Sequence, residues 1–332
     1  MGLKSVGMLS PQPRAKSRQR LIKIAYDRSF FLIMRNSEYL RVVEAIIGSL
    51  LKEDAGSGDV TTNALLSDEK IKAAIVAKDD GILAGAEEFA WLCGQNGVAV
   101  SRIKNDGERF AKGEKLFELE GPKRSVFLIE RTGLNLLQRM SGIATATRRI
   151  ADKVRRAGCG TVIAGTRKTP WGYLDKKALS LGGGCSHRLG LFESFLIKDN
   201  HIDSLKKQGI KNPVEFALEK AWEHRRRTVF IEVEARNQKE AMRAARKFRE
   251  LQEREKEIKA CIIMLDNMAP ADVRKTIASL KKRKLYDYVL IEASGNVDEK
   301  NVVEYAKAGA DACSLGSLTH SAKAIDISQK II

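Results

Sequence analysis

The sequence lacks any apolar run that approaches the roughly 18–20 residues of a membrane-spanning helix. Its 43% hydrophobic and 30% charged residues are ordinary values for a soluble protein. The five cysteines include no CxxC pair, and no secretory signal accompanies them. Both features favour a reducing compartment. We therefore expect a soluble cytoplasmic protein with no membrane partner, which folds without disulfides.

Aromatic residues are also scarce, at 6% of the chain, although the formal net charge is +17. A basic surface that binds RNA usually places aromatic side chains among its lysines and arginines, or carries a known motif. Here the basic residues of 206–256 fall among Glu and Gln on amphipathic patterns, which favours solvated helix faces. We expect small anionic substrates and no specific nucleic acid. The alternative from a different class is a basic nucleic-acid-binding module that retains an inactive enzyme fold.

Residues 1–36 form a basic tail, in which eight basic residues and the single acid Asp27 supply seven of the seventeen net positive charges. Ser, Pro and Arg dominate up to Arg20, and an interrupted apolar stretch covers 21–34. This composition predicts a poorly ordered or weakly helical segment. It also overlaps with that of organelle transit peptides, and a start site misplaced ahead of Met34 explains it equally well.

Residues 37–142 predict a small α/β domain. Apolar residues recur at helical spacing from 37 to 51, and 71–77 predicts a strand. A helix is expected over 86–95, with further strands within 98–119. Long helical patterns follow from about residue 123 to residue 156 and lead to a region of different character.

Beyond Gly160, short apolar runs alternate with amphipathic helices, which is typical of βα units and a parallel sheet. Each run ends in polar or charged residues. A doubly wound sheet concentrates such residues at one switch point, whereas a barrel gathers them around its carboxyl face. Because nearly every run has a polar end, we favour the barrel. The ends are Thr166-Arg167-Lys168-Thr169, Lys198-Asp199-Asn200-His201, Glu234, Asp266-Asn267, Glu292-Ala293-Ser294-Gly295 and Gly316-Ser317.

The charged candidates separate by sign along the chain. Cations come first and suit a ligand with several carboxylates. Carboxylates follow and suit ribose hydroxyls, Mg²⁺ or a developing positive charge. Glycine-containing loops after the last strands of a barrel commonly hold a phosphate, so a phosphorylated sugar is expected. The cations are Arg131, Arg167, Lys168, His187, Arg188 and Lys198, the carboxylates are Glu234, Asp266 and Glu292, and the loops are Ser294-Gly295-Asn296 and Gly316-Ser317.

Two patterns leave the role of single residues open. Arg131, Asn135 and Arg139 share a helical face, which a solvated stripe explains as well as a ligand site does. Glu232 and Glu234 point to the same side of their strand, and only one of them need touch a ligand.

Read in order over about residues 38–328, the motifs resemble those of the quinolinate phosphoribosyltransferases, also called nicotinate-nucleotide pyrophosphorylases. Any one motif is weak, but the ordered set is highly specific. The motifs are Glu53-Asp54, Gly58-Asp59-Val60-Thr61-Thr62, Glu130-Arg131-Thr132 with Leu134-Asn135, Ser141-Gly142-Ile143-Ala144-Thr145, Thr166-Arg167-Lys168-Thr169, Gly182-Gly183-Gly184 with His187-Arg188, Leu196-Ile197-Lys198-Asp199-Asn200-His201, Glu232-Val233-Glu234, Leu265-Asp266-Asn267, Glu292-Ala293-Ser294-Gly295 and Gly316-Ser317-Leu318-Thr319-His320-Ser321-Ala322.

The resemblance implies a pentosyltransferase of NAD biosynthesis. Such an enzyme joins quinolinate to phosphoribosyl pyrophosphate and releases carbon dioxide and pyrophosphate, giving nicotinate mononucleotide with Mg²⁺ and no organic cofactor. It implies an N-terminal α/β sandwich over 37–142, on which 319–332 is able to pack, and an incomplete, open α/β barrel over 143–318. It also implies a homodimer or an assembly of dimers, in which Arg131 reaches the partner's active site.

The same resemblance implies a role for each matched residue. Lys168, Glu234 and Asp266 are the implied catalytic residues, and Glu234 and Asp266 hold Mg²⁺ directly or through water. The implied quinolinate site is Arg131, Arg167, Lys168, His187, Arg188 and Lys198, and the implied phosphoribosyl pyrophosphate site is Lys168, Glu234, Asp266, Ser294, Gly295, Gly316 and Ser317.

One loop departs from the family pattern. Many members continue after Thr-Arg-Lys-Thr with Thr-Pro-Gly-Leu-Arg, whereas 170–177 is shorter here and lacks the arginine. Lys176 or Lys177 either compensates for that arginine or is solvated. The alternatives on the same scaffold are a nicotinate-specific enzyme and the related proteins of molybdenum-transport loci.

Overall fold

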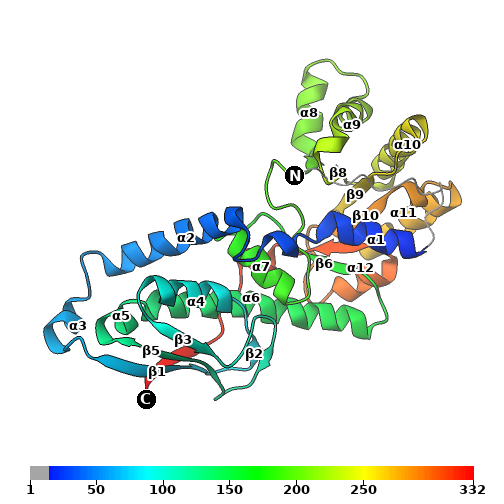
Figure 1. Cartoon of the computed structure of the whole chain (residues 1–332). Coiled ribbons are helices and arrows are strands. Elements are labelled where there is room, and N and C mark those ends of the chain that lie inside the picture. The colour runs from blue at the N-terminus through cyan, green and yellow to red at the C-terminus, as the bar shows by residue number, and fades with distance from the viewer. Residues whose placement is uncertain (1–14) are drawn as a thin grey trace. The chain divides into compact units, whose positions relative to one another are not determined.

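The structure is a computed structural model that describes residues 15–332, and it divides into two compact units (Figure 1). The barrel unit comprises 15–27, 152–164 and 187–315. The sandwich unit comprises 28–151, 165–186 and 316–332. Segments 165–186 and 316–332 thus group with the sandwich unit. Of these, 165–186 and 316–318 were expected within one continuous barrel range, 143–318.

The barrel unit is built on a six-stranded parallel sheet with the strand order β6-β11-β10-β9-β8-β7. β6 and β7 are the two edges and do not pair, so the sheet is open. The expected incomplete α/β barrel is therefore confirmed. The elements are β6 (Val162–Ala164), β7 (Phe195–Ile197), α8 (Asp199–Lys207), α9 (Pro213–Glu223), β8 (Phe230–Ala235), α10 (Gln238–Glu255), β9 (Ala260–Asp266), α11 (Pro270–Lys282), β10 (Leu290–Ser294), α12 (Val302–Ala308) and β11 (Ala312–Ser314).

The central strands are buried on both faces, as parallel strands covered by helices usually are, and they are mostly apolar apart from Glu232 on β8 and Glu292 on β10. Cys261 to Leu265 of β9 are all buried, and β8 is buried from Phe230 to Val233. Leu251 and Phe248 of α10 and Val273 of α11 are fully buried on their helices. This core places the carboxyl ends of β7 to β10 beside one another, and the predicted polar residues lie at these ends.

The sandwich unit consists of a four-stranded antiparallel sheet, β12-β1-β5-β3, and helices packed on it. Phe89 and Phe117, whose ring centroids lie 5.0 Å apart, join a helix to the sheet. The C-terminal strand completes this sheet. The elements are α2 (Ser37–Ala55), α3 (Val60–Leu65), β1 (Lys70–Ala77), α4 (Ala86–Gln95), β3 (Ala99–Arg102), β5 (Lys115–Pro122), α5 (Lys123–Leu128), α7 (Tyr173–Leu181), α13 (Ser317–His320) and β12 (Ile327–Ile331), with the two-stranded ribbon β2 (Gly81–Ile82) and β4 (Arg109–Phe110); α6 (Glu130–Arg156) runs across the unit boundary.

Of the two alternatives for the tail, poor order does not hold for residues 15–36, whereas a helix is present there; residues 1–14 lie outside the described chain. Ala15–Tyr26 form helix α1, and Ile22, Ala25 and Tyr26 are buried in the barrel unit. The interrupted apolar stretch is therefore one face of a packed helix. Its apolar residues Leu21, Ile22, Ala25 and Tyr26 have helical spacing, and this signal was available in the sequence.

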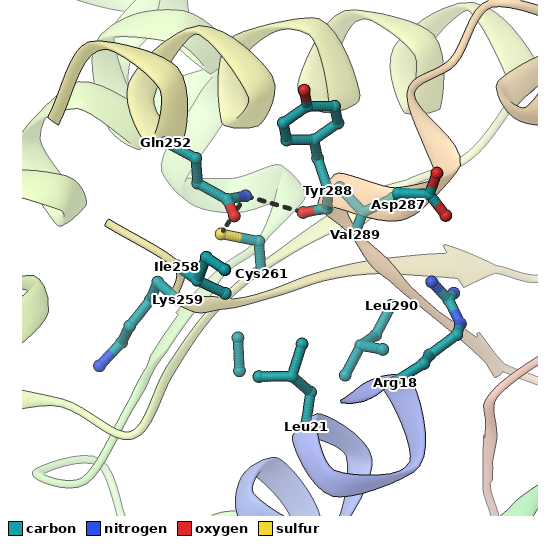
Figure 2. A pocket seen from close by; sticks show the side chains of 11 residues that line it. Arg18, Leu21, Gln252, Ile258, Lys259, Cys261, Asp287, Tyr288, Val289 and Leu290 are labelled. Atoms are coloured by element: carbon teal, nitrogen blue, oxygen red, sulfur yellow. Dashed lines mark hydrogen bonds between the residues drawn. The ribbon is translucent and has the colours of Figure 1, made fainter. Parts of the chain in front are cut away.

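The contact of α1 with the barrel unit can be followed in Figure 2. Leu21 and Arg18 line a small cavity of about 10 Å³ together with β9 and the start of β10. On the opposite wall, Gln252 donates a hydrogen bond to the Tyr288 carbonyl at 2.8 Å. A space of this size holds about one water molecule, so the helix is closely packed against the strands.

We expect Arg18→Ala to lower the free energy of unfolding by roughly 2–4 kcal/mol, because it leaves the buried carboxylate of Asp311 without its partner. The Arg18 Nε donates to Asp311 Oδ1 at 2.8 Å, and Asp311 is only 8% exposed. Urea unfolding measures the change. The control is Arg155→Ala, which removes an exposed pair with Asp152 and should cost less than about 0.5 kcal/mol. Equal losses in the two variants would contradict a stabilising role for α1.

Candidate active site

The carboxyl ends of β7, β8 and β9 bring three predicted residues together in the barrel unit. Lys198 directly follows β7, and its Nζ lies 3.5 Å from Oε1 of Glu234 near the end of β8. Burial raises the pKa of Glu234; the charge of Lys198 opposes this effect, and that of Asp266 on β9 adds to it. A cation therefore lies beside two neighbouring carboxylates, at the face where barrel enzymes bind substrates.

The loop after β10 turns sharply at Gly295. Its φ of +78° is in the left-handed region, and a Cβ there would stand 2.3 Å from Oδ1 of Asn267. The Asn267 N–H donates to the carbonyl of Ser294 at 2.9 Å. Only glycine fits this close approach. The structure thus explains the Ser294-Gly295 pair by backbone geometry, and phosphate binding at this loop stays a prediction.

His187 lies inside the barrel unit and forms ion pairs with two glutamates. Its Nε2 is 3.2 Å from Glu232 Oε2 and 3.5 Å from Glu292 Oε2, and both carboxylates are fully buried. Burial lowers the pKa of His187, but the two carboxylates outweigh it and raise the pKa to about 9. The imidazole is therefore a cation at neutral pH. Of the two candidates on β8, Glu232 pairs with His187 and Glu234 pairs with Lys198.

Arg188 follows His187 and is also buried, at 5% exposure. Its Nη1 donates to the Ser194 carbonyl at 3.0 Å. Its charge contributes to lowering the pKa of Glu232, against the larger effects of burial and Glu292, which raise that pKa to about 7. The loop that carries His187 and Arg188 is thus fixed by internal contacts.

In the sandwich unit, the Thr-Arg-Lys-Thr loop holds two predicted cations. Arg167 and Lys168 are both exposed. Thr319 Oγ1 donates to the Lys168 carbonyl at 2.8 Å, and the Lys168 side chain lies within 3.2 Å of the place where a Cβ on Gly316 would stand. The structure therefore brings Lys168 together with the predicted Gly316-Ser317 segment.

Arg139 and Asp175 hold this loop in place, and the sequence analysis did not assign them this role. Arg139 donates to both oxygens of Asp175, at 2.9 and 2.7 Å, and to the carbonyl of Thr319 at 2.9 Å. Thr169 Oγ1 also donates to Asp175, which is fully buried. The spacing of Arg131, Asn135 and Arg139 indicated one helix face. Arg131 and Asn135 on that face are exposed, and Arg139 instead has a structural partner.

Lys176 and Lys177 lie on helix α7, and neither side chain is solvated. Lys176 is 1% exposed, and its Nζ donates to the Ser186 carbonyl at 2.5 Å. Lys177 Nζ lies 2.7 Å from Glu87 and 2.6 Å from Glu88. Both ammonium groups hold parts of the sandwich unit together, so the suggestion that either one is solvated is wrong. The structure also gives no support for compensation of the absent arginine.

An open parallel barrel with cations and carboxylates at the strand ends defines an α/β-barrel enzyme for anionic substrates. The comparisons with known proteins specify which one. The model of the quinolinate phosphoribosyl transferase N-terminal domain matches residues 59–141, and that of the C-terminal domain matches residues 143–330. The chain belongs to the quinolinate phosphoribosyltransferase family.

Individual relatives match this chain over nearly the whole of their own length. The chain is 36% identical to a probable nicotinate-nucleotide pyrophosphorylase [carboxylating] of Methanothermobacter thermautotrophicus, over 86% of this chain and 98% of the relative. It is 38% identical to the protein of that name from Methanocaldococcus jannaschii, over 86% and 96%. The solved nicotinate-nucleotide pyrophosphorylase of Francisella tularensis matches with a TM-score of 0.75 at 29% identity, covering 88% of this chain and 96% of that one.

In the described part of the chain, no helix is both long and apolar enough to cross a membrane.

Proposed function

We propose that this protein catalyses the transfer of a phosphoribosyl group from phosphoribosyl pyrophosphate to quinolinate. The products are nicotinate mononucleotide, pyrophosphate and carbon dioxide. The observation that carries the proposal is the ordered set of charged residues at the strand ends, in a chain whose residues 59–141 and 143–330 match the two domain models of this family. The product, nicotinate mononucleotide, is a pyridine nucleotide of NAD biosynthesis.

The cations account for the choice of an acid with two carboxylates. Lys198 and Arg167 are exposed at strand ends and supply fixed positive charge. His187 and Arg188 are buried cations in the barrel unit. We assign to quinolinate the set Arg131, Arg167, Lys168, His187, Arg188 and Lys198.

The transfer itself is a displacement at the ribose carbon. The ring nitrogen of quinolinate attacks, pyrophosphate leaves, and the sugar carries positive charge in the transition state. Glu234 and Asp266 lie at neighbouring strand ends and stabilise that charge, and Lys168 neutralises the leaving oxygens. Ser294, Gly295, Gly316 and Ser317 form the proposed 5-phosphate site. Decarboxylation follows, because the quaternary ring nitrogen stabilises the carbanion left when the adjacent carboxylate departs as carbon dioxide, and this carbon then takes a proton from water.

A magnesium ion fits the carboxylate oxygens of Glu234 and Asp266, since hard divalent cations prefer oxygen ligands. When it is bound with the substrate, it neutralises the negative charge of the pyrophosphate. Burial and the charge of Asp266 raise the pKa of Glu234, and the charge of Lys198 beside it opposes this rise.

We further propose a homodimer that works in the cytoplasm, with Arg131 completing the site of the partner. The exposed position of Arg131 on α6 supports this assignment. All five cysteines are free thiols, which suits a reducing compartment.

Competition between quinolinate and nicotinate tests the proposed function. We expect quinolinate to be preferred by about two to three orders of magnitude in kcat/KM, because removing one carboxylate leaves a cation unpaired at a cost of roughly 2–5 kcal/mol. The assay follows nicotinate mononucleotide and carbon dioxide at limiting phosphoribosyl pyrophosphate with Mg²⁺. Equal use of both acids would contradict the expected selectivity, and a preference for nicotinate would favour the nicotinate-specific alternative. Mononucleotide formed from quinolinate without equimolar carbon dioxide would contradict the reaction.

A further inference from the structure

Tyr26, the last residue of α1, is fully buried in the barrel unit. Its hydroxyl donates to Glu292 Oε2 at 2.7 Å, and its carbonyl accepts from the backbone N–H of His187 at 3.0 Å. The tyrosine ring meets the imidazole edge-on, with 5.4 Å between centroids, and stacks against Phe230 at 6.4 Å. A single residue of the N-terminal helix thus contacts the histidine through its backbone and its ring, and also binds one of the two glutamates paired with that histidine.

The glutamates reach His187 from two strands that flank β9. Glu232 pairs in register with Ile262 and Glu292 with Met264, so both side chains project on the same side of the sheet. The charged and titratable groups that face the imidazole are Tyr26 from α1, Glu232 from β8 and Glu292 from β10, with Arg188 next to it in the chain. Each of these groups lies in the barrel unit.

Helix α1 lies outside the segments that define the family, since the N-terminal family model begins at residue 59. The Methanothermobacter relative is matched over 98% of its length but covers only 86% of this chain. The roles implied for the matched motifs therefore say nothing of Tyr26, and its contacts with His187 and Glu292 are a separate observation.

We propose that Tyr26 is a positioning residue of the active site: acting through Glu292 and its own ring, it fixes the orientation and charge of His187 for a carboxylate of the substrate. The inference rests on the proposed function in one respect, the assignment of His187 to the acid. Tyr26 itself takes no part in the chemistry. The N-terminal helix is then required for substrate binding.

The first test is Tyr26→Phe, which keeps the ring contacts and removes only the hydroxyl. We expect the KM for quinolinate to rise about tenfold, with kcat within about twofold and the KM for phosphoribosyl pyrophosphate unchanged, because one hydrogen bond to a charged group is lost. A purely structural residue would change stability without separating the two KM values.

Tyr39→Phe is the matched control. Tyr39 is equally buried, and its hydroxyl donates to the buried Glu88 at 2.8 Å in the sandwich unit. This variant loses the same kind of hydrogen bond away from His187. We expect a similar loss of thermal stability and an unchanged KM for quinolinate.

Glu292→Gln removes the negative charge beside His187 and keeps the size and shape of the side chain. The pKa of His187 is raised by two carboxylates, so removing one lowers it and the imidazole loses its proton at a lower pH. The alkaline limb of kcat/KM, which reports the free enzyme, should therefore move down by about one pH unit or more. An unmoved limb in this variant, or an unchanged KM in Tyr26→Phe, overturns the proposal.

An NMR titration separates this inference from the proposed function, because it needs no substrate. The protein has four histidines, and a His187→Gln variant assigns the His187 signal. We expect the wild-type imidazole to titrate at about pH 9 and the Glu292→Gln imidazole clearly lower. The same titration midpoint in both proteins contradicts the proposal even if the enzyme uses quinolinate. A stoichiometric transition metal in the wild type that is lost in His187→Gln would make His187, Glu232 and Glu292 a metal site instead and would also overturn it.

Discussion

Lys198→Ala is expected to lower kcat/KM for quinolinate by about two to three orders of magnitude, the result of leaving a substrate carboxylate without its cation at a cost of roughly 2–5 kcal/mol. Lys198 is about half exposed, and within the described residues it forms one ion pair, with Glu234, so the fold does not depend on it. The thermal midpoint should therefore stay within about 2 °C, since a surface ion pair contributes little. Steady-state kinetics and a melting curve measure the two effects.

The control is Lys206→Ala, which removes a lysine from helix α8 in the same region, where it is paired with the exposed Asp203. It should behave as wild type in both measurements. Wild-type turnover in Lys198→Ala would remove Lys198 from the site.

Lys198→Ala also tests whether two protomers contribute residues to one active site. Arg131→Ala should be inactive alone, and mixing it with Lys198→Ala should restore activity if each site takes Arg131 from one protomer and Lys198 from the other. Absence of rescue after verified subunit exchange would mean that Arg131 acts within its own chain.

Lys177→Ala is expected to lower the free energy of unfolding by roughly 3–5 kcal/mol, because it leaves buried carboxylates without their cation. Lys177 Nζ lies within 4 Å of three acids, namely Glu87, Glu88 and Asp106. Burial raises the pKa of Glu88 and of Asp106, and in both cases the charge of Lys177 opposes that rise. Without the lysine these pKa values rise further.

This reasoning also gives the pH dependence of the loss. An acid whose folded pKa lies above its unfolded value binds protons more tightly in the folded state, so stability falls as pH rises through that range. The loss of unfolding free energy in Lys177→Ala should therefore be smaller near pH 5 than near pH 8. Urea unfolding at both values measures it. Lys115→Ala, which removes an exposed pair with Glu118, is the control and should cost less than about 0.5 kcal/mol at either pH. A deficit that does not change with pH would contradict the buried-carboxylate explanation.

Much of the barrel was predictable, because each strand is a local signal. The apolar runs at 195–197 and 262–265 are parts of β7 and β9, and the predicted helix over 86–95 is α4. A buried parallel strand usually has apolar residues on both faces and a polar end, and a few consecutive residues are enough to recognise both features. The positions of Lys198, Glu234 and Asp266 at the carboxyl edge of the sheet follow from this pattern, whereas the open form of the barrel was expected from the resemblance to the family.

The pairings inside the site were decided by the tertiary structure alone. Nothing local distinguishes Glu232 from Glu234, yet one binds His187 and the other binds Lys198. Arg139 lies 36 positions from Asp175, and Tyr26 lies 266 positions from Glu292. Side chains so far apart meet only when the whole sheet and its helices have packed, and burial then fixes which charges must be paired.

The sequence by itself therefore determined the family, the barrel and the sign of the charge at each strand end, because these depend on short runs of residues. The tertiary structure decided that α1 is packed, that Lys176 and Lys177 are structural, and that His187 is a buried cation. These properties depend on which polar groups, distant in the sequence, are buried next to one another. In the interior an unpaired charge is costly, so a buried charge is held in place by its partner.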